Sequence, residues 1–157
     1  MEFYVRDANK TNFEKGSFDI IYSSRGPLSA SFKILSEAMR ILKKKGLLIE
    51  ETIGECDKIE IKEILQRGQD YPVTNRKLNE VKKLLKKIGA TVIFSKDYKY
   101  TLAYMTIQDI INLLQRAPIV PDFDEEKDAP KLNKLKTSSD GIHLTTHRLQ
   151  WVAQNNS

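Results

Sequence analysis

The sequence predicts an α/β protein built around a sheet of mainly parallel strands. Short apolar runs without polar alternation indicate strands that are covered on both faces. Stretches with apolar residues at helical spacing lie between these runs, and glycines follow several of them, as is typical of helix ends. A chain of 157 residues has the length of one domain, so we expect a single domain over residues 1–157.

The first part of the chain predicts two strands, a helix and a third strand. The runs Phe3–Val5, Phe18–Tyr22 and Leu47–Ile49 are apolar and β-prone. A helix over Ser29–Lys44 is expected to stop at Gly46. The crossover between the second and third strands has the length of a right-handed parallel connection. These elements therefore predict one strand–helix–strand unit.

Two capping boxes predict the starts of further helices. Asp57 with Glu60, and Thr106 with Asp109, have the spacing at which side chains and backbone N–H groups satisfy each other at a helix start. We expect Gly68 to close the first of these helices. The apolar positions are Ile61, Ile64 and Leu65 in the first helix, and Ile107, Ile110, Ile111 and Leu114 in the second.

A longer helix is expected between these two. Thr74 or Asn75 can cap its start, and Gly89 follows its last turn. A strand over Ala90–Phe94 comes next. The helix carries Leu78, Val81, Leu85 and Ile88 on one side.

The last part of the chain combines a polar stretch with a final strand. Pro118 and Pro121 end the preceding helix, and Pro121–Asp140 is acidic and then basic, as expected of a surface excursion. Ile142–Ala153 alternates between apolar and polar residues, which predicts an antiparallel strand.

Composition excludes several classes of protein. No apolar run approaches the roughly 18 residues of a membrane span, and no signal peptide is recognisable at the start, so we expect a cytoplasmic protein without a membrane partner. The net charge of +5 comes mainly from lysines that fall on the polar side of the expected helices. A solvated helix face explains these lysines, and nucleic acid is an unlikely partner.

No metal site is expected from the sequence. Cys56 is the only cysteine, which excludes an internal disulfide and a cysteine-based zinc cluster. His143 and His147 would lie about 13 Å apart on one face of a strand, too far to share a metal. The alternating acids of Asp122–Asp128 lack the turn glycine of a calcium loop, so a solvated acidic loop explains them better.

One stretch resembles a known family. Asp7-Ala8, followed by Phe13 and then Ser17-Phe18-Asp19, is similar to the segment that leads from the third to the fourth strand in class I S-adenosylmethionine (SAM)-dependent methyltransferases, although Thr11 and Asn12 replace the usual Leu-Pro. Arg40–Glu51 and Gly141–Gln154 are similar to the family's fifth and last strands. The resemblance implies a Rossmann-like sheet of parallel strands with a reversed carboxyl-terminal hairpin.

The resemblance also implies a site at the carboxyl ends of the strands, where open α/β sheets bind ligands. Asp7 would accept a hydrogen bond from the adenine amino group, and the Ala8 N–H would donate to a ring nitrogen. Ser23 would contact the methionine part of the cofactor, and Ser24 and Arg25 the methyl acceptor. The simpler interpretations are that Asp7 caps a turn and that Arg25 is an exposed arginine before a helix. The acceptor and any catalytic residue are unknown, since methyl transfer chiefly needs alignment.

The family's glycine-rich cofactor loop is missing. The seven glycines are so spread that no two lie within three residues of each other. We therefore interpret the chain as an amino-terminally truncated methyltransferase domain, through a split gene, a miscalled start or a true loss. By itself it is expected to bind SAM weakly or not at all. The exposed edge of the fourth strand would accept an amino-terminal partner chain or a second copy. The alternative function is a non-catalytic binding or oligomerisation module on the same scaffold.

Overall fold

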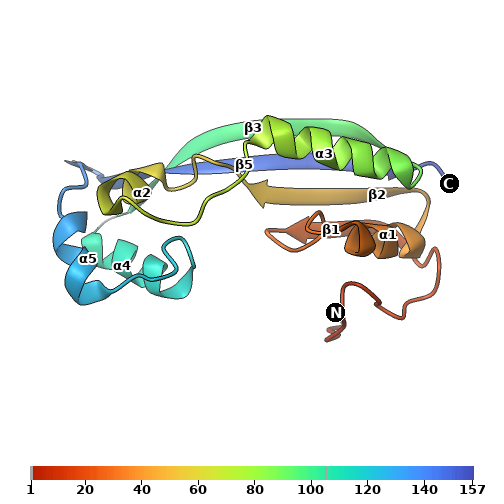
Figure 1. Cartoon of the computed structure of the whole chain (residues 1–157), viewed down its shortest axis with the longest axis horizontal. Coiled ribbons are helices and arrows are strands. Elements are labelled where there is room, and N and C mark those ends of the chain that lie inside the picture. Colours follow the sequence, from red (N-terminus) through yellow and green to blue (C-terminus); the bar gives the residue numbers. More distant parts are fainter. Residues whose placement is uncertain (1, 105) are drawn as a thin grey trace. The chain divides into compact units, whose positions relative to one another are not determined.

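The computed structural model describes residues 2–104 and 106–157, and within them it forms five strands and five helices (Figure 1). No described helix combines the length and the hydropathy needed to cross a membrane. The elements are, in order, β1 Phe18–Ser24, α1 Phe32–Ile41, β2 Leu42–Ile53, α2 Ile59–Leu65, α3 Thr74–Lys87, β3 Ala90–Tyr104, α4 Ile107–Arg116, α5 Glu125–Leu132, β4 Thr137–Ser138 and β5 Gly141–Asn155.

The strands form one mixed sheet with the order β1-β2-β5-β3, and β4 pairs with β5 beside this path. β1 and β2 are parallel, with Ile21 opposite Leu48 and Ser23 opposite Glu50, whereas β4 and β5 are antiparallel. The predicted parallel strand–helix–strand unit is therefore confirmed. The sheet is not purely parallel, and the reversed direction of a final hairpin stays a prediction.

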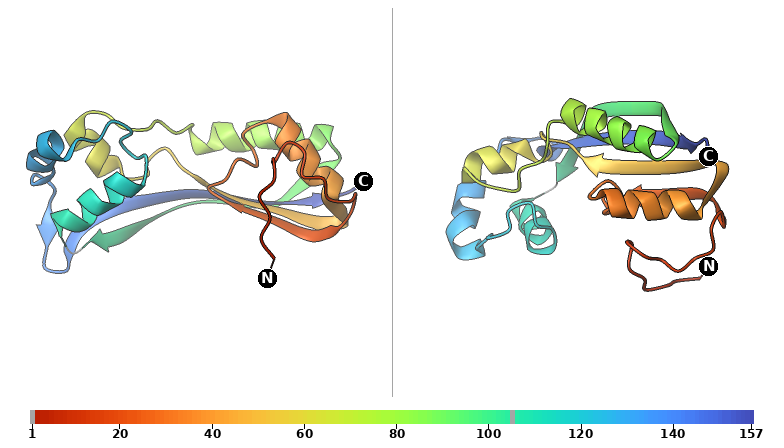
Figure 2. Two further views of the ribbon diagram at one scale, coloured as in Figure 1. Left: turned by 90° about the horizontal axis from the view of Figure 1, so that it is seen from below. Right: turned by 45° about the vertical axis from the view of Figure 1, so that its right-hand side comes forward.

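The contacts of the chain group it into two compact units, each of which we describe by itself. Unit 1 comprises residues 1–53, 73–97 and 149–157. Its two helices, α1 and α3, cover one face of the sheet (Figure 2). The residues buried there are Leu28, Leu35, Ala38, Met39, Leu42, Leu48, Val81, Leu85, Ala90, Trp151 and Ala153. Ile20 and Tyr22 remain more than half exposed.

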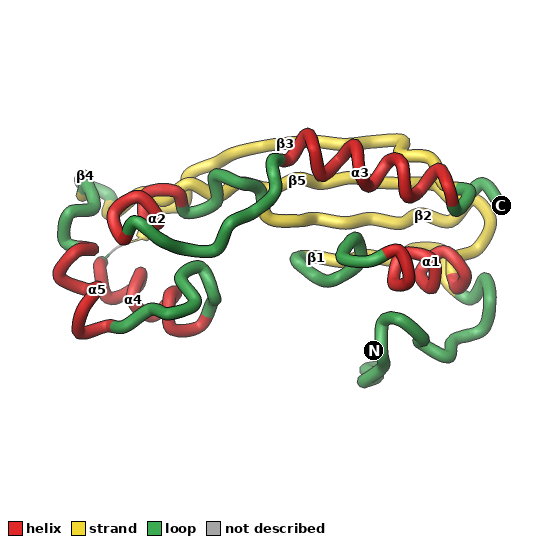
Figure 3. The backbone as a smooth tube through the Cα atoms, viewed as in Figure 1, coloured by secondary structure: helices red, strands yellow, loops and turns green. Residues whose placement is uncertain are grey.

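Unit 2 comprises residues 54–72 and 98–148 and is mostly helix and loop (Figure 3). It contains α2, α4, α5 and β4, together with the last part of β3 and the first part of β5. Its apolar core consists of Ile61, Leu65, Ile110, Ile111, Leu114, Ile119, Val120, Leu132, Leu135, Ile142 and Leu144. The single domain over residues 1–157 stays a prediction.

The predicted elements near the start of the chain need three corrections. Phe3–Val5 is not a strand, and α1 is shorter than the expected helix over Ser29–Lys44. Gly46 does not end that helix but lies within β2, after a bulge in which Lys45 has a φ of 63°. A Cβ at Gly46 would lie 2.8 Å from the Lys43 carbonyl oxygen and 2.9 Å from that of Asp19, so the close backbone approach requires glycine.

One capping box is wrong and the other is confirmed. α2 begins after Lys58, which has left-handed backbone and no side-chain cap, because Asp57 and Glu60 bind β5 instead. Thr106 and Asp109 form the full capping box of α4. The helix also ends before Pro118, as expected.

The predictions for the later part of the chain are also partly confirmed. The surface excursion expected over Pro121–Asp140 contains α5, capped by the Asp124 carboxylate, which accepts a hydrogen bond from the Lys127 N–H at 3.2 Å. The helix ending before Gly89 and the final strand are both confirmed.

Candidate functional site

The carboxyl ends of β1 and β2 lie side by side, since the two strands are parallel and in register. Ser23 and Ser24 stand opposite Glu50 and Glu51. The Ser24 hydroxyl approaches a Glu51 carboxylate oxygen at 3.5 Å, and the Arg25 N–H donates to the Glu51 carbonyl oxygen at 2.8 Å. Ser24, the Arg25 backbone and Glu51 therefore contact one another at the end of β1.

A tight turn follows β1 and fixes the place of its last hydroxyls. Arg25 has a φ of 54°, in the left-handed region that non-glycine residues rarely adopt. A Cβ at Gly26 would lie 2.6 Å from the Ser23 hydroxyl oxygen, so glycine leaves room for this hydroxyl beside the turn. The half-buried Ser23 is thus held against the turn, while Ser24 and Arg25 are exposed.

Glu50 is a buried carboxylate that sequence reasoning did not single out. It is fully buried and accepts hydrogen bonds from the Ser29 N–H and the Trp151 indole N–H, both at 3.0 Å. Burial lowers the pKa of Lys77, and the charge of Glu50 partly opposes this shift. Glu50 therefore ties the loop after β1 to β5. The only available signal was its position two residues after Leu48, on the same face of β2.

Asp7 caps a turn, which was the simpler of its two interpretations. One carboxylate oxygen accepts from the Asn9 N–H at 2.8 Å and from the Asn9 side-chain amide at 2.9 Å. These bonds lower the pKa of the exposed Asp7 carboxyl, and Lys33 at the start of α1 adds a smaller attraction. The neighbouring Ala8 is half-buried. Adenine recognition by this pair stays a prediction.

The segment after Asp7 runs along α1. The Thr11 N–H and hydroxyl both donate to Glu37, at 2.8 and 2.6 Å, and Arg40 donates to the Phe13 carbonyl oxygen at 2.7 Å. Arg40 and Thr11 hold the pKa of Glu37 at about 2. Since Asp7 lies toward Lys33 and Phe13 toward Arg40, the Asp7–Ala8 turn is at the same end of α1 as the end of β1. The predicted cofactor residues thus come from one end of unit 1.

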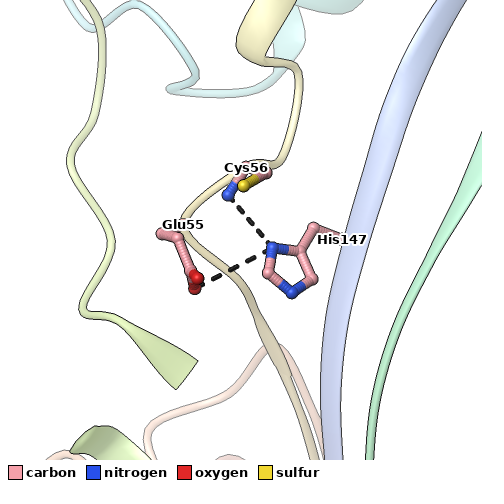
Figure 4. A group of neighbouring side chains, drawn as sticks. All are labelled: Glu55, Cys56 and His147. Atoms are coloured by element: carbon pink, nitrogen blue, oxygen red, sulfur yellow. Dashed lines mark hydrogen bonds and ion pairs between the residues drawn. The ribbon is translucent and has the colours of Figure 1, made fainter. Parts of the chain in front are cut away.

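A second group of polar side chains lies in unit 2. Possible ligand atoms of Glu55, Cys56 and His147 lie within 4.8 Å of one another (Figure 4). However, His147 Nδ1 accepts the Cys56 backbone N–H at 3.0 Å, and a Glu55 oxygen lies 3.9 Å from the same nitrogen. A metal on Nδ1 would have to displace that N–H. His143 is exposed and bonded to Asp140, so it does not join the group.

The group is explained by packing. A Cβ at Gly54 would lie 2.5 Å from the imidazole ring, so Gly54 and His147 are in close contact. The Gly54 N–H also donates to the His147 carbonyl oxygen at 3.0 Å. We assign the group to the attachment of residues 54–56 to β5.

Comparison with known proteins gives a match at the level of structure. No family model and no curated protein matches the chain. A methyltransferase-like structure from Bacillus halodurans superposes with a TM-score of 0.55 and 14% identity, over 96% of this chain and 70% of that one. A SAM-dependent methyltransferase from Methanosarcina mazei superposes with a TM-score of 0.53 and 13% identity, over 98% of this chain and 66% of that one. The fold is that of the class I methyltransferases.

The match does not fix the reaction. The cyclase SpnF superposes equally well on this methyltransferase fold, with a TM-score of 0.54 and 14% identity, over 98% of this chain and 55% of that one. The chain therefore spans between about half and seven tenths of the length of these structures. Function has to be argued from the site.

The residues of unit 1 fit part of SAM. Asp7 and the backbone of Ala8 have the acceptor and donor that the edge of adenine requires, and Ser23 adds a hydroxyl at the end of β1. No closely spaced glycines offer the run of backbone N–H groups that cradles a ligand at a helix start. Asp7, Ala8 and Ser23 thus offer groups that suit the adenine and methionine parts of SAM, and the sequence has no glycine-rich run.

Proposed function

We propose that this chain carries the adenine-binding and acceptor-binding part of a SAM-dependent methyltransferase and that the glycine-rich part lies outside residues 1–157. The observation that supports the proposal is that Asp7–Ala8, near Lys33 at the start of α1, and Ser23–Arg25, at the end of β1, belong to the same end of the strand–helix–strand unit of a methyltransferase fold. When bound, SAM would supply an activated methyl group.

The roles of the chain's own residues follow from their positions. Asp7 and Ala8 would bind the adenine edge, and another base would leave one of these two groups without its hydrogen-bond partner. Ser23 would contact the methionine part, and Ser24 and Arg25 would orient the acceptor. The exposed guanidinium of Arg25 suits an acceptor with an acidic group. The acceptor itself and the cytoplasmic location remain expectations.

The partner would join at the edge of β1. This strand stands at the end of the sheet order, and Ile20 and Tyr22 on it are 56% and 60% exposed. An open strand edge with apolar side chains pairs readily with a strand of another chain. The partner is either a chain that carries the glycine-rich part or a second copy. Sedimentation of the isolated chain separates the two, since only the second copy gives a dimer, which Ile20→Lys should dissociate.

A non-catalytic binding module is the second candidate. The spread of the glycines favours it, because the chain alone then has no reason to bind SAM tightly. The module would keep the scaffold and its open strand edge, and it would bind a partner without methyl transfer.

An NMR titration with S-adenosylhomocysteine tests the proposal. At millimolar ligand we expect shifts confined to the amides of residues 7–10 and 23–26, and their loss in Asp7→Asn. Asp19→Asn is the matched control, since Asp19 is an exposed acid at the other end of β1, paired with Lys43 at 2.9 Å. No shift at any residue would favour the non-catalytic module, and shifts confined to unit 2 would refute the assigned site.

A further inference from the structure

Unit 2 contains a cavity that the proposed function does not use. Its volume is about 650 Å³, and it lies among α2, the loop after α5, β4 and the start of β5. Pockets of 300–1,000 Å³ are of the size that binds small molecules. Glu60 and Glu63 line it from α2, and Lys134, Lys136 and His143 line it from the other segments. The cavity thus has groups of opposite charge on different elements.

The carboxylate of Glu60 is held in place. The Thr145 N–H donates to both of its oxygens at 3.0 Å, and the Thr145 hydroxyl donates to Oε1 at 2.5 Å. A carboxylate has about four acceptor positions, so Oε2 keeps acceptor capacity for a further donor. Glu63, three residues later on the same surface of α2, is exposed. An ammonium group would find one rigid and one adaptable carboxylate there.

The basic side of the cavity is also built on ordered backbone. The Lys134 N–H donates to the Lys131 carbonyl oxygen at 3.0 Å, and the Leu135 N–H to that of Leu132 at 2.9 Å. Leu135 is only 6% exposed, so Lys134 and Lys136 flank a buried anchor. Two mobile ammonium groups are therefore attached to a fixed turn.

His143 completes this side of the cavity. Its Nε2 lies 2.7 Å from an Asp140 oxygen that also accepts from the Ser138 hydroxyl at 2.7 Å. These two contacts hold the pKa of Asp140 at about 2, so the carboxylate stays charged and orients the ring. Leu135 and the half-buried Ile64 also line the cavity and add apolar surface to it.

We propose that this cavity binds a small zwitterion that carries an ammonium group at one end and a carboxylate at the other end of a short apolar chain. Glu60 and Glu63 bind the ammonium group, Lys134 and Lys136 bind the carboxylate, and Ile64 and Leu135 contact the apolar chain. A ligand with a single charge satisfies only one side and leaves its other end against groups that attract the missing charge. The inference does not depend on methyl transfer.

A titration with 6-aminohexanoate, followed by NMR of the whole chain, tests this site. We expect saturable shifts at residues 60–64, 134–138 and 143. Hexanoate and hexylamine, which lack one charge each, should bind up to about fivefold more weakly, since an exposed charge pair contributes up to about 1 kcal/mol. Equal affinity for all three molecules would overturn the proposal, and so would shifts outside these residues or no shift at 50-fold excess.

Two substitutions locate the charges. Glu63→Gln should weaken binding of 6-aminohexanoate about two- to fivefold, while hexanoate binding stays unchanged. Lys136→Gln should do the reverse, weakening hexanoate and sparing hexylamine. Glu126→Gln is the matched control, because Glu126 is an exposed glutamate on α5 outside the cavity. Affinities that are the same in Glu63→Gln and in the control would refute the assignment of the acidic side.

Discussion

Unit 1 and unit 2 are stabilised in different ways. In unit 1, two amphipathic helices bury leucine, methionine and tryptophan side chains against one face of the sheet, and Glu50 is the fully buried acid. In unit 2, short helices are tied together by ion pairs that link distant segments, such as Arg67 with Asp122 and Asp128, and Asp57 with Arg148. Both units have an apolar core, and unit 2 adds ion pairs between segments that are far apart in the chain.

Removal of Trp151 should have the largest effect on unit 1. Its side chain is fully buried and donates to Glu50, so Trp151→Ala should lower the free energy of unfolding by about 3–5 kcal/mol. Val152→Ala is the control, because Val152 is only half-buried. Urea unfolding followed by circular dichroism measures both. Equal losses in the two variants would contradict a core centred on Trp151.

In unit 2, substitution of Asp128 should have a large effect on stability. It is 1% exposed, and its two carboxylate oxygens accept from the Arg67 guanidinium at 3.2 and 2.6 Å. Asp128→Asn should increase amide exchange in α5 by a factor that corresponds to about 1–3 kcal/mol. Asp122→Asn should cost less than about 1 kcal/mol, because the side chain of Asp122 is 71% exposed. A larger effect of the exposed partner would refute this ranking.

The stability of unit 2 should also depend on acid pH through Asp128. Arg67 lowers the pKa of Asp128 from 3.8 to about 2. A lowered pKa in the folded state contributes stability above pH 3.8 that is lost as the pH falls toward 2. The difference in unfolding free energy between the native chain and Asp128→Asn should shrink over this range. A difference that is constant between pH 5 and pH 2 would contradict the pairing.

The smallest expected effects come from the helix caps, one in each unit. Thr106 and Asp109 form a complete capping box, whereas at the start of α1 the Ser31 hydroxyl accepts the Ile34 N–H at 3.2 Å without a reciprocal bond from an acidic side chain at the third helical position, which is Ile34. Thr106→Ala should cost about 1 kcal/mol and Ser31→Ala somewhat less. Thermal unfolding of both variants, with exposed Ser139→Ala as a control, checks the order. A larger loss from Ser31→Ala would reverse it.

The sequence predicts those elements whose signal is local. The apolar sides of α3 and α4, the Thr106 cap and the parallel pairing of β1 with β2 all follow from residues close together in the chain. Asp57 and Glu60 have the local spacing of a capping box. However, Glu60 binds Thr145, 85 residues away, and Asp57 binds Arg148, 91 residues away. No local pattern reports such partners.

In the candidate site, too, the sequence predicts the local features and not those that depend on distant residues. The positions of Ser23, Ser24 and Arg25 at the end of a strand are predicted from the strand itself. The burial of Glu50 depends on Trp151, 101 residues later, so it cannot be derived from its neighbours in the chain. The α5 helix was missed because its acidic first turn resembles a solvated loop until Arg67 neutralises Asp128.

The most direct test of the proposed methyltransferase role is the detection of intermolecular NOEs to S-adenosylhomocysteine. The account predicts NOEs between the adenine protons and Ala8, and between the methionine part of the ligand and Ser23, at millimolar ligand and with weak overall affinity. NOEs from adenine to residues of unit 2 would contradict it, as would tight binding by this chain without any contact to Ala8.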